Sequence, residues 1–533
     1  MTLEKTGFFG NRFDIDTLNL SAFGNPENAQ VIWSLSPLPG ASMSHIVASL
    51  DRYPYGCIEQ TSSGTRGMLA VAEFQGKKVS DSVKKKINHG IDGILAKQKS
   101  NGAFGYWDRN GRIESRYLAY AADTLIQALR YTDNKKAVKD GIAQALQFLD
   151  QQYFDDAWTA LYSYGVLAKS GYEVTSRARY AIDEQLKIAV KNANSMGKRL
   201  DLLAAGYWLA VMIHDDNRAA GIAESIDVLL KSTEKMSRPD QSASSGDWFN
   251  PTQSQGRSSA WSGWRVTSGI MLAALPKANR LPVINELISR AMQQLTTHAY
   301  RSTFDNANLA ALLAAKVGEL DQLDIQIDGK QADSSQPLNI ELATSGFAFT
   351  HSGDSDLFLN AEIVGRRQTV TAVDNGFRVN KFWFDKNGQV ISNNSGALEV
   401  KQGDVLTVVV TFEASNTLGS GSLMLTDLLP SGFEIESTPG FFPDFLNKPL
   451  VLSNVMTLNK NQIGAPLWTL SMDDRFTANY TDYWPKYRQT LVYYQVRATY
   501  PGTMQLPDAH VELMYRPESN GRSTSGRGQI SAK

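Results

Sequence analysis

The spacing of apolar residues divides the chain into segments of two kinds. Before about residue 46 and after about residue 320, apolar and polar positions alternate, which is typical of strands with one buried face. Between about 57 and 317 the apolar residues recur at spacings of three and four, which is typical of helices. The sequence therefore predicts a long helical segment with β structure on both sides of it.

The strands on either side of the helices are expected to form one domain. A cluster of prolines and glycine at 36–40 ends the first β part. Because the ends of a compact unit usually lie near each other on its surface, the simplest layout inserts the helices into a β domain whose halves are 1–46 and 321–365. The strands expected in these halves are 13–16, 18–20, 29–35 and a hairpin arm over 323–330, with further strands to about 365.

The helical segment has the form of a repeating array. About eleven or twelve amphipathic stretches follow one another between Gly, Asn, Asp or Pro breaks, as in a closed ring of helical hairpins. We therefore predict an α/α toroid over 47–320, in which inner and outer helices alternate. The clearest helices are expected at 67–74, 116–130, 158–169, 199–212 and 266–275.

The last part of the chain, 366–533, is expected to be a separate all-β unit. Residues 398–410 predict a strand, a turn and a second strand, because apolar residues alternate on both sides of a glycine. The predicted fold class is therefore multidomain α + β.

The composition narrows the classes of function. The 533 residues include 53 basic and 54 acidic side chains, so no global field favours nucleic acid or an anionic membrane. No run of about 18 apolar residues is present and the first residues do not form a signal peptide, so we expect the chain as given to be soluble. One cysteine and scattered histidines give no zinc spacing, and no phosphate loop is present, so neither a metal nor a cofactor is expected.

The only cysteine stands in an unusual stretch, Tyr53-Pro54-Tyr55-Gly56-Cys57-Ile58-Glu59-Gln60-Thr61. Attack of the Cys57 thiolate on the side-chain carbonyl of Gln60 would displace ammonia and close a β-cysteinyl-γ-glutamyl thioester. Gly56 lacks a Cβ and permits a tight turn before such a ring. The residues alone leave a second interpretation open, because cysteine is among the most buried residue types and is usually inert.

Residues 56–60 match the motif Gly-Cys-x-Glu-Gln, and in this motif the chain resembles the alpha-macroglobulin and complement family. The preceding Tyr-Pro-Tyr at 53–55 looks like the bacterial branch of that family. Residues 98–107 are similar to the Gly-x-Phe-x-x-Trp loop of thioester domains. Residues 425–434 and 500–507 resemble loops of the C-terminal macroglobulin-like domain. The resemblance therefore covers nearly the whole chain.

The resemblance implies a thioester domain of α/α-toroid type, inserted in a split CUB-like β domain and followed by a macroglobulin-like β sandwich. It also implies a broad-spectrum protease inhibitor, active on serine proteases among others, and not an enzyme. In such a trap a target protease cleaves an upstream bait segment, and a lysine amine of the protease then attacks the Gln60 carbonyl. The single-use reaction leaves an amide cross-link and a free thiol. The bait segment is not in this chain.

For the full-length protein the resemblance implies a periplasmic location, a lipid anchor in the inner membrane, and roles in host defence and bacterial colonisation. The expected partners are target proteases, joined covalently through lysine amines, and a periplasmic peptidoglycan-synthesis protein. We expect a monomer without a nucleic-acid partner.

The resemblance assigns the thioester cross-link and the acyl transfer to Cys57 and Gln60. A thioester hydrolyses in water, so bulky apolar or aromatic side chains have to exclude solvent from it. The predicted shield consists of Tyr53 and Tyr55 beside the ring and Met504 in a loop of the last domain. Each of these three side chains is also compatible with ordinary core packing.

Glu59 is expected either to polarise a nucleophile or orient the loop, or to be an exposed carboxylate at a helix start. Thr61 is a candidate cap of the following helix. Some family members add a histidine that redirects the acyl group to hydroxyls, but no histidine of this chain stands in such a motif, which leaves amines as acceptors. The six histidines are His45, His89, His214, His298, His351 and His510.

Two other classes of function stay open. Cys57 could serve a cysteine-dependent acyl-transfer enzyme, although no motif places its histidine and acidic partners. The aromatic stretches 98–107 and 247–264 could form a glycan-recognition surface, with the cysteine incidental, or could anchor loops on helix ends. The Asp215-Asp216 and Asp473-Asp474 pairs lack the third acid that a terpene cyclase needs.

Overall fold

The fold was analysed in a computed structural model. It describes residues 2–7, 12–13, 29–36, 43–51, 56–75, 79–193, 196–236, 272, 275, 279–297, 302–317, 324–327, 329–331, 340–341, 347–352, 358–365, 371–394, 396–414, 421–436, 445, 450–453, 456–458, 466–483 and 490–533. The chain divides into two compact units, one of residues 1–253 and 263–366, the other of 254–262 and 367–533.

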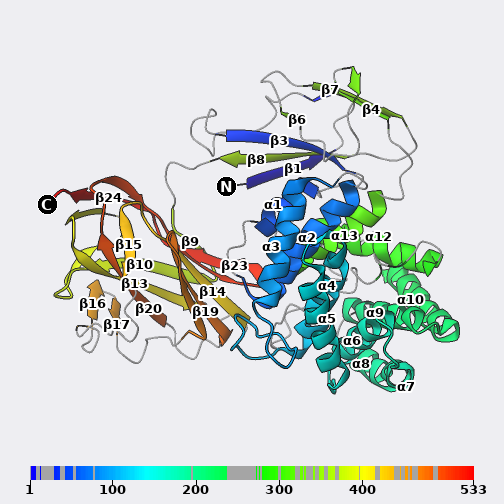
Figure 1. The fold of residues 1–533 in the computed structure, drawn as a ribbon. Helices are drawn as coiled ribbons and strands as arrows, with labels where there is room; N and C mark the ends of the chain where they lie inside the picture. The colour runs from blue at the N-terminus through cyan, green and yellow to red at the C-terminus, as the bar shows by residue number, and fades with distance from the viewer. Residues whose placement is uncertain are drawn as a thin grey trace. The chain divides into compact units, whose positions relative to one another are not determined.

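The β part of the first unit contains strands from both ends of that unit (Figure 1). One antiparallel sheet has the order β1-β8-β3-β6, and a second has the order β2-β7-β4-β5. The strands are β1 (Thr2–Gly7), β2 (Arg12–Phe13), β3 (Ala29–Ser36), β4 (Asp324–Ile327), β5 (Lys330–Gln331), β6 (Ile340–Glu341), β7 (Phe347–Ser352) and β8 (Phe358–Gly365). The helices are thus inserted between strands that pair with each other.

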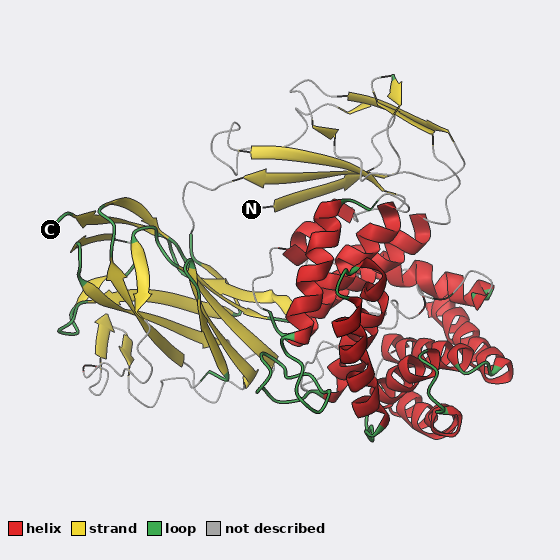
Figure 2. Ribbon diagram, in the orientation of Figure 1, coloured by secondary structure: helices red, strands yellow, loops and turns green. Residues whose placement is uncertain are grey.

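Helices make up the rest of the first unit (Figure 2). They are α1 (Met43–Asp51), α2 (Ile58–Gln75), α3 (Asp81–Leu95), α4 (Ser115–Ala128), the 3₁₀ turn η4 (Leu129–Tyr131), α5 (Lys135–Asp150), α6 (Ala157–Lys169), α7 (Thr175–Tyr180), the π-helix η5 (Ala181–Leu186), α8 (Lys187–Asn192), α9 (Met196–Met212), α10 (Asp216–Met236), α12 (Pro282–Thr297) and α13 (Thr303–Val317). The helices predicted at 67–74, 116–130, 158–169 and 199–212 are confirmed. The prediction at 266–275 lies almost wholly outside the described residues.

Burial separates inner helices from outer ones. Eleven successive residues of α6, from Ala157 to Leu167, are buried, so this helix is enclosed on all sides. By contrast, α3 buries one stripe, Val83, Ile87, Ile91 and Ile94, at the spacing of an amphipathic helix. The inner helices α2, α4, α6 and α9 contact one another in that order, and α13 packs against α2. This contact between the last and an early helix closes the ring.

The second unit is a β sandwich. One antiparallel sheet has the order β11-β10-β13-β20-β15 and the other β18-β19-β14-β22-β23-β9, with smaller sheets β12-β24-β21 and β16-β17. The strands are β9 (Val373–Asn375), β10 (Phe377–Phe384), β11 (Val390–Ser392), β12 (Ala397–Lys401), β13 (Val405–Ala414), β14 (Gly421–Leu428), β15 (Phe433–Glu436), β16 (Leu450–Ser453), β17 (Met456–Leu458), β18 (Trp468–Ser471), β19 (Arg475–Tyr483), β20 (Thr490–Ala498), β21 (Gly502–Leu506), β22 (Ala509–Leu513), β23 (Arg516–Arg522) and β24 (Gly526–Ser531).

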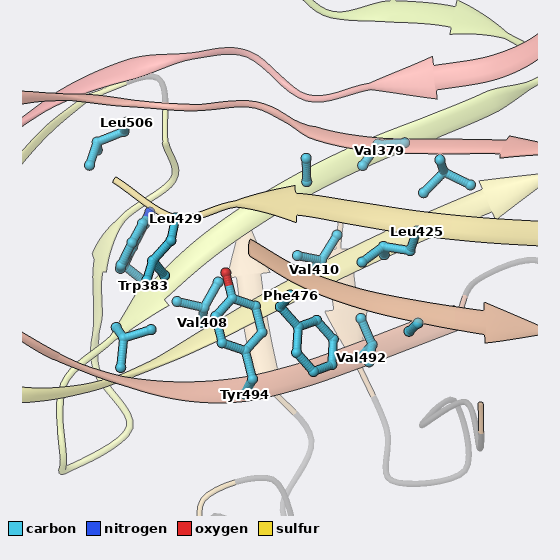
Figure 3. Close-up of a cluster of buried hydrophobic side chains, with 14 of the residues drawn as sticks. Val379, Trp383, Val408, Val410, Leu425, Leu429, Phe476, Val492, Tyr494 and Leu506 are labelled. Atoms are coloured by element: carbon cyan, nitrogen blue, oxygen red, sulfur yellow. The ribbon is translucent and has the colours of Figure 1, made fainter. Parts of the chain in front are cut away.

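The core of the sandwich is formed by the inward residues of these strands (Figure 3). Val408 and Val410 of β13 point to the same side, because alternate residues of a strand share a face. The rings of Phe476 and Tyr494 stack with their centroids 4.5 Å apart. The strand, turn and strand predicted at 398–410 are present as β12 and β13, which belong to different sheets.

The sandwich also buries one ion pair. Lys381 Nζ lies 2.6 Å from Asp427 Oδ1, and both side chains have no exposed surface. The Tyr494 hydroxyl donates a hydrogen bond to Asp427 Oδ2 at 2.7 Å. Removing one partner of such a pair leaves an uncompensated buried charge.

We expect Lys381→Met to lower the free energy of unfolding of this unit by about 3–5 kcal/mol, because Asp427 loses its cation in a place without solvent. Urea unfolding followed by tryptophan fluorescence measures the change. Lys386→Met removes an exposed lysine near the same sheet and should change stability by less than about 0.5 kcal/mol. Equal effects of the two substitutions would contradict the prediction.

Candidate thioester site

The stretch around Cys57 forms the start of α2. The helix begins at Ile58, and the Cys57 carbonyl accepts its first-turn hydrogen bond from the Thr61 N–H at 2.9 Å. The Ile58 N–H is outside the helical ladder, as expected in a first turn, and donates to the Tyr106 carbonyl at 2.8 Å. The predicted cap at Thr61 is wrong, because Thr61 lies inside the helix and its hydroxyl donates to the Gly56 carbonyl at 3.3 Å.

Cys57 and Gln60 lie together in this first turn, since residues three apart on a helix are neighbours. The Cys57 side chain is fully buried and Gln60 is 6% exposed. Gln60 Oε1 accepts from the Cys57 N–H at 3.4 Å, and Cys57 Sγ accepts from the Gln60 N–H at 3.5 Å. Within the described part of the chain, Gln60 Nε2 is buried without a hydrogen-bond partner. The thiol and the carboxamide thus contact the same short piece of backbone.

The electrostatic environment of Cys57 keeps its thiol protonated. Burial raises the pKa of the Cys57 thiol far above its usual value, and the nearby Glu59 charge raises it further. Backbone N–H groups and the charge of Lys97 lower that pKa by smaller amounts. A reactive catalytic cysteine has the opposite property, a depressed pKa.

Glu59 is fully buried. Its carboxylate accepts hydrogen bonds from Ser63 Oγ at 2.6 Å and from Thr303 Oγ1 at 3.1 Å. The interpretation as an exposed carboxylate is therefore wrong, although Glu59 does lie in the first turn of α2. Because Thr303 is the first residue of α13, this bond joins the start of α2 to the helix that closes the ring.

A buried charged cluster lies two turns further along α2. Arg66 Nη2 is 2.7 Å from Asp123 Oδ2 and 3.0 Å from the Tyr162 hydroxyl, and the guanidinium lies 4.4 Å from the centre of the Tyr120 ring. Lys169 Nζ also contacts Asp123. Burial acts to raise the pKa of Asp123, but the charges of Lys169 and Arg66 hold it well below its usual range. The cluster joins the inner helices α2, α4 and α6.

The aromatic loop at 98–107 packs inward. Phe104, Tyr106 and Trp107 are all buried, and the Tyr106 carbonyl holds the start of α2. Gly102 has a φ of 90°, and a Cβ there would meet the Gln144 carbonyl oxygen at 2.1 Å, so the turn requires glycine. The interpretation of these residues as loop anchors is confirmed. The second stretch, 247–264, lies outside the described residues.

Comparison with known proteins shows which proteins this chain is similar to. Residues 376–518 match the family model "Bacterial Alpha-2-macroglobulin MG10 domain". The chain is 26% identical to the alpha-2-macroglobulin of Escherichia coli K12 over 91% of this chain and 29% of that protein. It is 23% identical to the alpha-2-macroglobulin of Rickettsia conorii over 94% of this chain and 25% of that protein.

Solved structures agree over a longer span. Native E. coli alpha-2-macroglobulin, from domain MG7 to the C-terminus, matches with a TM-score of 0.68 and 22% identity, over 99% of this chain and 81% of that one. Salmonella alpha-2-macroglobulin reacted with methylamine matches with a TM-score of 0.69 and 22% identity, over 99% of this chain and 33% of that one.

The chain is similar to bacterial alpha-2-macroglobulins over more than nine tenths of its length, and residues 376–518 match their MG10 domain. It spans less than a third of the length of the curated relatives above. The structural matches show a shared fold of helices and antiparallel sheets, and the predicted fold class is confirmed.

Of the three predicted shield residues, the structure describes only Met504. Tyr53 and Tyr55 lie outside the described residues. Met504 lies on strand β21 and not in a loop, so its predicted loop position is wrong. Its side chain is 7% exposed and belongs to the core cluster of the sandwich, which agrees with the packing interpretation. Its role as a shield stays a prediction.

The described residues contain no group of three or more His, Cys, Asp or Glu side chains that could hold a metal ion. In the same part of the chain, no histidine side chain is hydrogen-bonded to Cys57; His510, for example, pairs with Glu512 in the sandwich. No helix in the ranges given above is both long enough and apolar enough to span a membrane.

Sequence reasoning missed the polar contacts of α2. Glu59, Ser63 and Arg66 stand four and three residues apart, so they share one face of the helix. All three are buried. Their spacing on one face of a helix was the signal for a buried network.

We expect Asp123→Asn to lower the free energy of unfolding of the helical unit by about 3–5 kcal/mol at pH 7, because Arg66 and Lys169 lose their shared carboxylate. The folded-state pKa of Asp123 is depressed, so its contribution is present above the unfolded pKa of about 3.9 and is lost as pH falls. Urea unfolding monitored by circular dichroism at pH 7 and pH 3 measures both effects.

The difference between the parent chain and Asp123→Asn should therefore shrink at pH 3. The matched control is Asp92→Asn, which alters an exposed carboxylate on α3 and should have little effect at either pH. A constant difference across the two pH values would contradict the assignment to charge.

Proposed function

We propose that this chain is the C-terminal part of a protease trap that captures its targets covalently through a thioester between Cys57 Sγ and the side-chain carbonyl of Gln60. The observation that carries the proposal is the pairing of a buried thiol with a buried carboxamide in one helical turn, where Gln60 Nε2 has no partner among the described residues. A buried polar atom without a hydrogen bond is costly, and loss of ammonia would remove this one.

Formation of the bond is a substitution at the Gln60 carbonyl carbon. The thiol adds, the carbon–nitrogen bond breaks, and ammonia leaves with the thiol proton. Burial then protects the product, because water is kept from the carbonyl and expulsion of a Cys57 thiolate is disfavoured in this environment.

Capture uses the stored acyl group once. An amine of the target, chiefly a lysine side chain, attacks the Gln60 carbonyl after bait cleavage upstream of this chain has exposed it. The product is an amide, and Cys57 is released as a free thiol. The reaction of a Salmonella relative with methylamine supports this chemistry for the family fold. Because each site reacts once, the protein is an inhibitor and not an enzyme.

The domain assignment is part of the same proposal. The halves of the CUB-like domain are 1–46 and 321–365, the thioester domain is 47–320, and the macroglobulin-like sandwich is 366–533. Tyr53, Tyr55 and Met504 would shield the bond. The full-length protein would be a lipid-anchored periplasmic monomer that protects the cell from host proteases during colonisation, together with a peptidoglycan-synthesis protein.

The two alternatives receive less support. A cysteine-dependent enzyme needs a thiolate and a base, whereas burial raises the pKa of Cys57 and no described histidine is hydrogen-bonded to it. A glycan-recognition surface needs exposed aromatic rings, whereas Phe104, Tyr106 and Trp107 are buried.

We expect no titratable thiol in the freshly purified native chain and one thiol per chain after methylamine treatment, because the amine opens the thioester. Since Cys57 is the only cysteine, a thiol reagent reports on this site alone. Gln60→Ala should show its thiol without amine once the chain is denatured, and Gln147→Ala, which alters an exposed glutamine on α5, should behave like the parent chain.

Labelling with a fluorescent primary amine tests the other product of the reaction, the amide at Gln60. It should label the parent chain covalently at Gln60 and leave both Cys57→Ala and Gln60→Ala unlabelled. Equal labelling of all three chains would refute the proposed capture chemistry.

A further inference from the structure

Helices α2 and α3 are packed closely at a regular register. A Cβ on Gly90 would lie 2.0 Å from Thr65 Oγ1, and a Cβ on Gly93 would lie 2.9 Å from Thr61 Cγ2. The two glycines of α3 thus allow close contact with two threonines of α2. Since the residue numbers rise on one helix as they fall on the other, the helices are antiparallel.

The same register brings Lys97 and Cys57 to the same end of the contact between α2 and α3. Lys97 is four residues beyond Gly93 and lies in the turn just after α3, and Cys57 is four residues before Thr61 and directly precedes α2. Lys97 Nζ donates to the Gly93 carbonyl at 3.2 Å, and Gly93 is the residue of α3 that approaches Thr61 of α2. The side chain is half-buried.

The aromatic loop fixes both ends of this contact. The Lys97 carbonyl accepts from the Gly105 N–H at 3.0 Å, and the next residue, Tyr106, accepts from the Ile58 N–H at 2.8 Å. Two consecutive residues of one loop therefore hold the backbone at Lys97 and the backbone next to Cys57. The position of the lysine relative to the thiol is set by hydrogen bonds on both sides.

We propose that Lys97 supplies the positive charge that stabilises the Cys57 thiolate when an amine opens the thioester. This inference rests on the proposed function and adds a residue that acts on its leaving group. In the step, a bond forms between the amine nitrogen and the Gln60 carbonyl carbon, and the carbon–sulfur bond breaks. The sulfur leaves with the electron pair beside the Lys97 ammonium, and the proton lost by the attacking amine goes to solvent.

The charges around the site agree with this role. Burial lowers the pKa of Lys97, while the Cys57 and Asp108 charges raise it. Around Cys57, Glu59 opposes a thiolate and Lys97 favours one. Burial and Glu59 raise the pKa of Cys57, and the positive charge of Lys97 lowers it.

The test compares Lys97→Met and Lys97→Arg in the full 533-residue chain, with Lys99→Met as the control. Lys99 is a half-buried lysine two residues away that lines a separate surface pocket of about 540 Å³. The measured quantity is the rate of thiol release by methylamine. We expect Lys97→Met to slow release about tenfold, and Lys97→Arg and Lys99→Met to remain within about twofold of the parent chain.

The pH dependence separates charge from packing. The ratio of parent to Lys97→Met rates should fall toward one as pH rises through the lysine pKa, because the parent then loses the charge that the variant lacks. The ratio of the Lys97→Arg rate to the Lys97→Met rate should not change with pH, since the guanidinium of arginine remains charged. The inference would be overturned if the ratio of parent to Lys97→Met rates did not change with pH. It would also be overturned if Lys97→Met and Lys97→Arg slowed thiol release equally.

The same Lys97 variants can be tested without the thioester in chains that also carry Gln60→Ala. In Gln60→Ala chains Cys57 remains a thiol, and its alkylation by iodoacetamide at about pH 8 follows the thiolate fraction. We expect Lys97→Met to be alkylated about tenfold more slowly than Lys97→Arg in this background. Equal rates would contradict the role of Lys97 even if the proposed thioester is confirmed, and absence of the thioester would refute the proposed function alone.

One further outcome would also overturn the inference. If the parent chain showed both a mass about 17 Da low and a thiol that titrates before amine treatment, Lys97 itself would be the acyl acceptor. Lys97→Arg would then restore amine-dependent release.

Discussion

The first turn of α2 is held from two sides by hydrogen bonds to distant parts of the chain. The Ile58 N–H is bound by the Tyr106 carbonyl, and the Glu59 carboxylate is bound by Thr303 at the start of α13. These bonds put Cys57 and Gln60 in a place without solvent, although both belong to a helix end, where backbone groups usually face water. The proposed thioester needs this exclusion of water, and the burial of Cys57 and Gln60 supplies it.

Two charged residues near that turn, Glu59 and Lys97, have opposite effects on the Cys57 thiol. The Glu59 charge raises the pKa of the Cys57 thiol, whereas the Lys97 charge lowers it, which is the basis for the role proposed for Lys97 in opening the proposed thioester. The Arg66–Asp123 pair is deeper in the ring and bonds inner helices to each other. Such pairs contribute little net stability when complete, but removal of one member is strongly destabilising.

Several features could be predicted from the sequence because they follow from local patterns. The three- and four-residue spacing predicted α6 and α9, and the alternating pattern predicted β3 and β13. The chemistry of two residue types three positions apart made Cys57 and Gln60 candidates, and the motif resemblance favoured them; both side chains contact one helical turn, while the thioester between them stays a prediction. Burial of Glu59 was not predictable in this way, because it depends on Thr303, more than two hundred residues away. Met504 was misplaced because a Pro-Gly pair resembles a loop although the next residues pair with β24. Lys97 was missed because its significance depends on the register of two helices.

The most direct test of the account is the intact mass of the freshly purified chain. A covalent thioester predicts a mass about 17 Da below the sequence value, from the loss of ammonia, and a gain of about 31 Da on treatment with methylamine. An unmodified mass, with Cys57 titrating as a thiol in the denatured chain before any amine is added, would contradict the central claim.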